Sequence, residues 1–128
     1  ALYSRGITVG ATSIKGSYPP TAWIGSDSGS TRAAILREIP AGSLVAPQET
    51  TSVDSLFADT NALTGTDPTA SATSVAPAPS ADRPYVYQPI SDTGTLCTTT
   101  AQTCRKFNIY AWQETAPTAA VKVESRFR

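Results

Sequence analysis

The sequence lacks histidine and methionine altogether and contains only two cysteines, Cys97 and Cys104. Without histidine, a Ser-His-Asp or Cys-His catalytic site is excluded. Two cysteines are too few for a structural zinc site, which takes four ligands. The glycine-rich signatures of nucleotide-binding loops, GxGxxG and GxxxxGK[ST], are also absent. We therefore expect a protein that is not an enzyme and that carries no metal and no cofactor.

Charged residues and long apolar runs are scarce as well. Charged residues make up 16% of the 128 residues, and no run approaches the roughly 18 apolar residues of a membrane-spanning helix. The formal net charge is zero, but acidic residues gather in residues 49–92 and basic residues from Arg105 onward. Such asymmetry is mostly a solvated surface, and we do not expect nucleic-acid binding. Carboxylate pairs such as Asp54 and Asp59 could in principle serve glycoside hydrolysis, but nothing distinguishes them from surface charges.

Six polar or small residues, TTTAQT, separate Cys97 from Cys104. A thioredoxin-type redox motif has two intervening residues, so this spacing favours a loop whose ends are joined by a disulfide, the alternative being two free thiols. Closing this short ring should stabilise the fold by about 2 to 2.5 kcal/mol. A disulfide also implies an oxidising compartment, and hence an exported protein.

The last third of the chain shows the alternation of β-strands. In RKFNIYAWQE (105–114), apolar side chains alternate with polar and aromatic ones, and AAVKVESRF (119–127) alternates in the same way. The earlier segment PYVYQP (84–89) is rich in strand formers, although its prolines favour a short or edge strand. Three strands in succession predict an antiparallel meander over residues 85–128. Both cysteines would then lie on the loop between the first two strands.

Short helices and a loop are expected before this sheet. The segment STRAAILREIPAG (30–42) predicts a helix of about two turns, with a cap at Ser30 or Thr31 and an end before the proline. The segment SVDSLFADT (52–60) predicts a single helical turn. Residues 64–84 are rich in Pro, Ser, Thr and Ala, and they predict an exposed loop.

Residues 1–15 admit two interpretations. Their glycines and β-branched residues have poor helix propensity, which favours strand or coil. However, Leu2, Ile7, Ala11 and Ile14 can form an apolar stripe, and the glycine and prolines of GSYPP (16–20) suit a helix end.

Several segments together resemble the globular head of a type IV pilin or pseudopilin, notably the compact pilins of monoderm and candidate-phylum bacteria. They are IKGSYPP (14–20), AAILREIPAGSLVAP (33–47), YVYQPISDTGTLC (85–97), CRKFNIYAWQE (104–114) and VKVESRF (121–127). The resemblance implies one α+β domain over residues 1–128. In this domain a helix remnant at 1–15 and short helices pack on a three- to four-stranded antiparallel meander with one disulfide.

The resemblance also implies a function. Such a protein is a structural subunit of an extracellular, cell-surface filament that serves adhesion, motility, DNA uptake or secretion. Family members begin with an aromatic residue, a glutamate at the fifth position and a long apolar helix, whereas this chain has Ala1 and Arg5. We therefore expect that the apolar half of the helix has been removed. That missing segment would provide membrane contact and most contacts with other pilin subunits, so the soluble domain should be monomeric.

A second hypothesis is a free-standing secreted β-rich binding module that recognises a host or surface ligand through exposed aromatics. Tyr110 and Trp112 share one face of the strand 105–114, and with the basic residues Lys106 and Arg126 they form a candidate interaction surface. The alternative for the two aromatics is ordinary packing beneath the N-terminal helix or residues 64–84.

Overall fold

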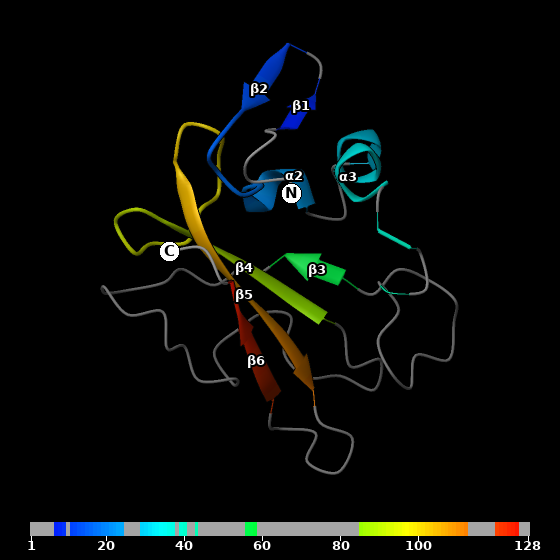
Figure 1. Ribbon diagram of the computed structural model, residues 1–128, viewed down its shortest axis with the longest axis vertical. Helices are drawn as coiled ribbons and strands as arrows, with labels where there is room; N and C mark the ends of the chain where they lie inside the picture. The colour runs from blue at the N-terminus through cyan, green and yellow to red at the C-terminus, as the bar shows by residue number, and fades with distance from the viewer. Residues whose placement is uncertain are drawn as a thin grey trace.

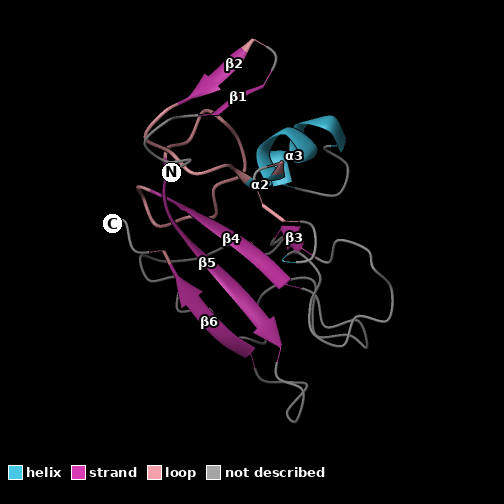
Figure 2. Cartoon of the chain, turned by 45° about the vertical axis from the view of Figure 1, so that its right-hand side comes forward, coloured by secondary structure: helices cyan, strands magenta, loops and turns pink. Residues whose placement is uncertain are grey.

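The computed structural model describes residues 7–9, 11–24, 29–37, 39–40, 43, 56–58, 85–112 and 120–125. A four-stranded sheet forms the centre of this part, and two short helices and a small hairpin lie at one end of it (Figures 1 and 2). Residues 1–6 and 64–84, for which the sequence predicts a helix and an exposed loop, lie outside the described residues.

The predicted antiparallel meander is confirmed. Strands β4, β5 and β6 are consecutive in the chain and adjacent in the sheet, and both pairings are antiparallel. The register places Tyr87 beside Ile109, and Ile109 beside Val123. The strands are β4 (Tyr85–Ser91), β5 (Cys104–Trp112) and β6 (Ala120–Glu124).

A fourth strand, β3 (Leu56–Ala58), corrects one sequence prediction. Residues 52–60 were expected to form a helical turn, but Leu56–Ala58 pair with β4. The pairing is parallel, so the sheet is not wholly antiparallel. Leucine and phenylalanine are compatible with a strand as well as with a helical turn. An isolated helical turn is unfavourable by itself, whereas pairing with the edge of β4 provides backbone hydrogen bonds.

A second correction concerns the N-terminus, where the resemblance to pilins predicts a helix over residues 1–15. Instead β1 (Ile7–Val9) and β2 (Thr12–Ile14) form an antiparallel hairpin. Three of these six strand residues are isoleucine or valine and two are threonine, and such β-branched side chains are restricted in a helix but favoured in strands. The propensity interpretation is therefore correct for residues 7–9 and 12–14, and the helix interpretation is wrong for these residues.

Two helices follow the hairpin: α2 (Thr21–Ile24) and α3 (Gly29–Leu36). The two-turn helix predicted in residues 30–42 is confirmed, although it begins at Gly29 rather than after a cap at Ser30 or Thr31. Arg32 of α3 donates to the carbonyl oxygen of Ile24, which ties the two helices together. Within the described ranges, neither helix has the length and apolar character that a bilayer crossing requires.

The main apolar core lies between these N-terminal elements and one face of the sheet. Its buried members come from β2, α2, α3 and β4: Ile14, Ile24, Ile35, Leu36 and Tyr87. Trp23, Phe107 and Ile109 pack against them. Because side chains alternate along a strand, Tyr87, Phe107 and Ile109 share a face, while Gln88, Asn108 and Tyr110 lie on the opposite one.

Tyr87 gives the core a pH-dependent contribution to stability. Its hydroxyl donates to the carbonyl oxygen of Pro19 at 2.9 Å. Burial, and to a smaller extent the neighbouring Tyr18, raise the pKa of Tyr87 far above its ordinary value of 10.0. The folded state therefore keeps this proton at pH values at which the unfolded chain loses it.

We expect the free energy of unfolding to fall above pH 10 more steeply in the native sequence than in Tyr87→Phe. The contribution is fully present below the unfolded pKa and is lost as the pH rises above it, by up to roughly 1.4 kcal/mol per pH unit. Denaturant unfolding of both proteins from about pH 9 to about pH 11 measures the slopes. Equal slopes would contradict the buried, protonated state of Tyr87.

Candidate functional site

The disulfide predicted from the sequence is present. Cys97 and Cys104 are joined by an S–S bond of 1.97 Å, with their Cα atoms 5.8 Å apart. Cys104 is the first residue of β5, so the bond closes the connection between β4 and β5. Both cysteines are fully buried, and they form a small apolar cluster with Tyr18, against which Phe107 packs.

Polar side chains within the disulfide loop bond to the loop itself. Gln102 Oε1 accepts hydrogen bonds from the backbone amides of Thr98 and Thr99, at 2.8 and 3.2 Å. At the end of β4, Ser91 Oγ accepts from the backbone amide of Thr95 at 3.1 Å. The loop thus has a defined conformation that its own side chains support.

The N-terminal segment is hydrogen-bonded to both ends of this loop. The backbone amide of Tyr18 donates to the carbonyl oxygen of Cys104, and that of Thr21 donates to the carbonyl oxygen of Cys97, each at 2.9 Å. In the other direction, the Cys104 amide donates to Ser17 Oγ at 2.8 Å. Residues 17–21 therefore lie directly against the disulfide, far from it in sequence but in contact in space.

We expect Ser17→Ala to lower the free energy of unfolding by about 1 to 3 kcal/mol. Ser17 is buried, and its loss removes the acceptor of the buried Cys104 amide, whose desolvation then has no compensation. Ser13→Ala is the matched control, because Ser13 is exposed and its hydroxyl shares a hydrogen bond with another exposed hydroxyl, that of Thr8. Urea unfolding compares the variants, and equal losses at both serines would contradict the structural role of Ser17.

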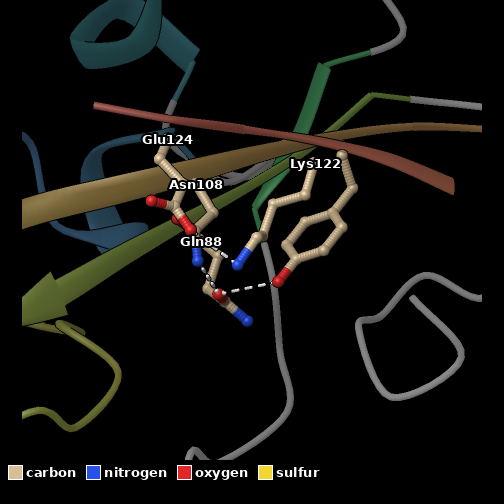
Figure 3. A network of polar contacts seen from close by, with 5 residues as sticks. Gln88, Asn108, Lys122 and Glu124 are labelled. Atoms are coloured by element: carbon tan, nitrogen blue, oxygen red, sulfur yellow. Dashed lines mark hydrogen bonds and ion pairs between the residues drawn. The ribbon is translucent and has the colours of Figure 1, made fainter. Parts of the chain in front are cut away.

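A buried polar cluster occupies the opposite face of the sheet (Figure 3). Asn108 Nδ2 donates to Gln88 Oε1 at 2.9 Å, and the Tyr110 hydroxyl donates to the same oxygen at 3.3 Å. All three residues are buried, with Tyr110 only 1% exposed. Both hydrogen bonds link β5 to β4. Buried polar groups are normally hydrogen-bonded, so these bonds account for the burial of polar side chains on this face.

A lysine and a glutamate of β6 extend the cluster toward solvent. Lys122 Nζ lies 2.6 Å from Glu124 Oε1, and the two side chains are 30% and 63% exposed. The register sets Glu124 opposite Asn108 and Lys122 opposite Tyr110. An amine, a carboxylate and a carboxamide therefore share one face of β5 and β6.

The structure describes only part of the predicted interaction surface. Tyr110 is 1% exposed, so it is not an exposed aromatic. It lies on the sheet face opposite to the N-terminal elements, so an N-terminal helix does not cover it, and residues 64–84, the other expected cover, lie outside the described residues. Lys106 is exposed in the first half of β5. Trp112 is the last residue of β5, and neither its side chain nor Arg126 belongs to the described part of the chain.

Sequence reasoning missed Gln88, Asn108, Lys122 and Glu124 as a group. Alternation in β5 does place Asn108 and Tyr110 on one face. Gln88 is also recognisable in the sequence as a polar residue within the apolar segment PYVYQP. The contact between these side chains, however, depends on the registers between β4 and β5 and between β5 and β6. In the described ranges, no group of three or more His, Cys, Asp or Glu residues is arranged to hold a metal ion.

Comparison of the chain with protein-family models, with curated proteins and with solved structures finds no match.

Proposed function

We propose that this chain is a structural subunit of a type IV pilus or a related extracellular filament, and that it acts by assembly and surface display. The observation that carries the proposal is the buried disulfide at the loop that connects the first two strands of a three-stranded meander. Disulfides persist in oxidising environments outside the cytosol. The resemblance to pilin heads also predicts a small sheet with one disulfide and with short helices on one face. The hairpin at residues 7–14 departs from this resemblance.

The polar clusters support a structural role. The side chains of the disulfide loop and of the Gln88 cluster bond to each other and to the backbone. Buried hydrogen-bonded networks can give a domain rigidity and a single conformation. Rigidity suits a subunit that repeats along a filament and displays its loops.

An exposed apolar pair on β6 supports contacts between subunits. Val121 and Val123 are both at least half exposed, and their alternation with Lys122 puts them on one face of the strand. Neighbouring copies in a filament would remove this apolar area from water. Two valines alone contribute far less than the roughly 800 Å² per partner of a standard stable interface.

We therefore expect the isolated 128-residue chain to be monomeric in solution. Contacts between its acidic residues 49–92 and its basic residues from Arg105 onward are expected to be weak and to fade with salt. Sedimentation at low and at high ionic strength measures this. A tight dimer that is insensitive to salt would argue for a self-contained binding module.

The gene sequence upstream of the Ala1 codon tests the function itself. The proposal expects a leader that ends in glycine, followed by an apolar stretch of about 20 or more residues. A signal-peptidase site directly before Ala1 would instead favour the secreted module. Antibodies raised against the chain provide a second readout, since they should label filaments on intact cells.

A further inference from the structure

The cluster in Figure 3 contains the chemical groups of an amide-forming reaction. Asn108 in β5 provides a carboxamide, Lys122 in β6 a primary amine, and Glu124 in β6 a carboxylate. Glu124 is the direct cross-strand neighbour of Asn108, and Lys122 is the neighbour of Tyr110. Lys122 is therefore diagonal to Asn108 on the same face, a separation that long side chains span.

Asn108 lies between polar side chains of both neighbouring strands. Strands β4 and β6 flank β5 on opposite sides, and Asn108 Nδ2 donates toward β4, to Gln88 Oε1. The nitrogen of the carboxamide is thus bonded to β4, while β6 carries Glu124 directly opposite Asn108. On that side, the Lys122 amine lies within 2.6 Å of the Glu124 carboxylate.

We propose that Lys122 and Asn108 form an intramolecular isopeptide bond, with Glu124 as the group that moves the protons. The Lys122 ammonium first gives a proton to the Glu124 carboxylate, and the neutral amine attacks Asn108 Cγ. The Nζ–Cγ bond forms and the Cγ–Nδ2 bond breaks. Nδ2 receives the protons that Nζ loses, relayed by Glu124, and leaves as ammonium. The carboxylate is regenerated.

This step needs no oxidant, cofactor or second substrate. One ammonium side chain and one carboxamide become one secondary amide and one ammonium ion, so atoms and charge balance. Neighbours on adjacent strands replace a bimolecular encounter by an intramolecular one, which raises the rate whenever the Lys122 amine comes within about 3 to 3.5 Å of Asn108 Cγ. Partial exposure of Lys122, at 30%, provides a way out for the ammonia, while Asn108 and Tyr110 are buried from water.

The bond would add a covalent link between two strands of the sheet. The disulfide joins the loop residue Cys97 to the first residue of β5 and so shortens the connection between β4 and β5. The isopeptide bond would join β5 to β6 directly and would resist forced separation of these two strands.

Intact-mass spectrometry of the purified, reduced full-length chain tests the proposal. The measured mass should be lower than the sequence mass by one ammonia. Trypsin should fail to cleave after Lys122, because an acylated lysine is not a substrate. A protease specific for glutamate cleaves after Glu114, between the two bonded residues, and the fragments on either side should stay joined.

Three variants separate this reaction from other losses of ammonia. Lys122→Arg and Glu124→Gln should both have their full sequence mass, since one lacks the amine and the other lacks the proton carrier. Lys106→Arg is the matched control, because this exposed lysine of β5 is not in the cluster and its variant should keep the deficit. Full mass in the native chain would overturn the proposal. So would a deficit that persists in Lys122→Arg, since that marks a cyclic imide of asparagine.

Discussion

Replacing Ile35 by alanine is expected to lower the free energy of unfolding by about 2 to 5 kcal/mol. Ile35 lies in α3 and is only 2% exposed, and it belongs to the core shared with Ile14, Ile24 and Tyr87. The truncation removes buried methyl and methylene groups and leaves a cavity between the helix and the sheet. Its neighbours are held by separate elements, β2, α2 and β4, so they can close the cavity only in part.

Ile39→Ala is the matched control, since it makes the same chemical change a few residues away. Ile39 is 36% exposed, so its truncation should cost much less, roughly 0.5 kcal/mol, as for other surface substitutions. Urea titrations of both variants give the two values at constant m. Similar losses at the two positions would show that α3 does not pack on the sheet as described.

The core follows partly from the sequence. Spacing in AAILREIP predicts α3, and alternation predicts β5 and β6, because both patterns report which side of a single element is apolar. The same local reasoning failed at β3. There, pairing with β4 decided the structure of three residues, and a neighbour 29 positions away, such as Tyr85 opposite Leu56, is invisible in a local window.

The N-terminal hairpin shows the opposite error. Residue propensities in ITV and TSI favour strands, whereas the resemblance to pilins predicts a helix. The short hairpin is stable here because the buried Ile14 joins the core formed by α2, α3 and β4. Local propensity and tertiary packing therefore agree at this position, and the resemblance was the weaker guide.

The polar cluster could be predicted only in outline. Alternation puts Asn108 and Tyr110 on one face of β5, so the two side chains are expected to be buried or exposed together. Nothing local indicates that Gln88 lies across from Asn108 or that Glu124 lies on its other side. A shift of one residue in either register would send these partners to the opposite face. The disulfide helps to specify the first of these registers because it closes the end of the β4–β5 hairpin.

Breaking the Cys97–Cys104 bond is expected to lower the free energy of unfolding by about 2.5 kcal/mol, which corresponds to a fall in melting temperature of roughly 10 °C. The bond spans a sequence separation of seven residues. Most of its effect comes from the unfolded chain, whose freedom increases when the ring is opened. Both cysteines are buried, so reduction is best carried out in denaturant before refolding under reductant.

Thermal unfolding of the oxidised and the reduced chain measures the difference without changing any side chain. The double variant Cys97→Ala, Cys104→Ala controls for the reductant, because its melting temperature should be the same with and without it. An identical melting temperature for the oxidised and reduced native chain would contradict a contribution from the bond to the stability of this domain.

The reduced chain should nevertheless keep its sheet. The core around Ile35 and Tyr87 shares no buried member with the cluster that contains the cysteines, although Phe107 packs against both. The N-terminal segment is held to the loop through backbone atoms, from the Tyr18 and Thr21 amides to the carbonyl oxygens of Cys104 and Cys97, and these bonds do not require the sulfurs to be joined. Far-ultraviolet circular dichroism should therefore be nearly unchanged on reduction. Complete loss of the strand signal would mean that the domain folds only once the disulfide has formed.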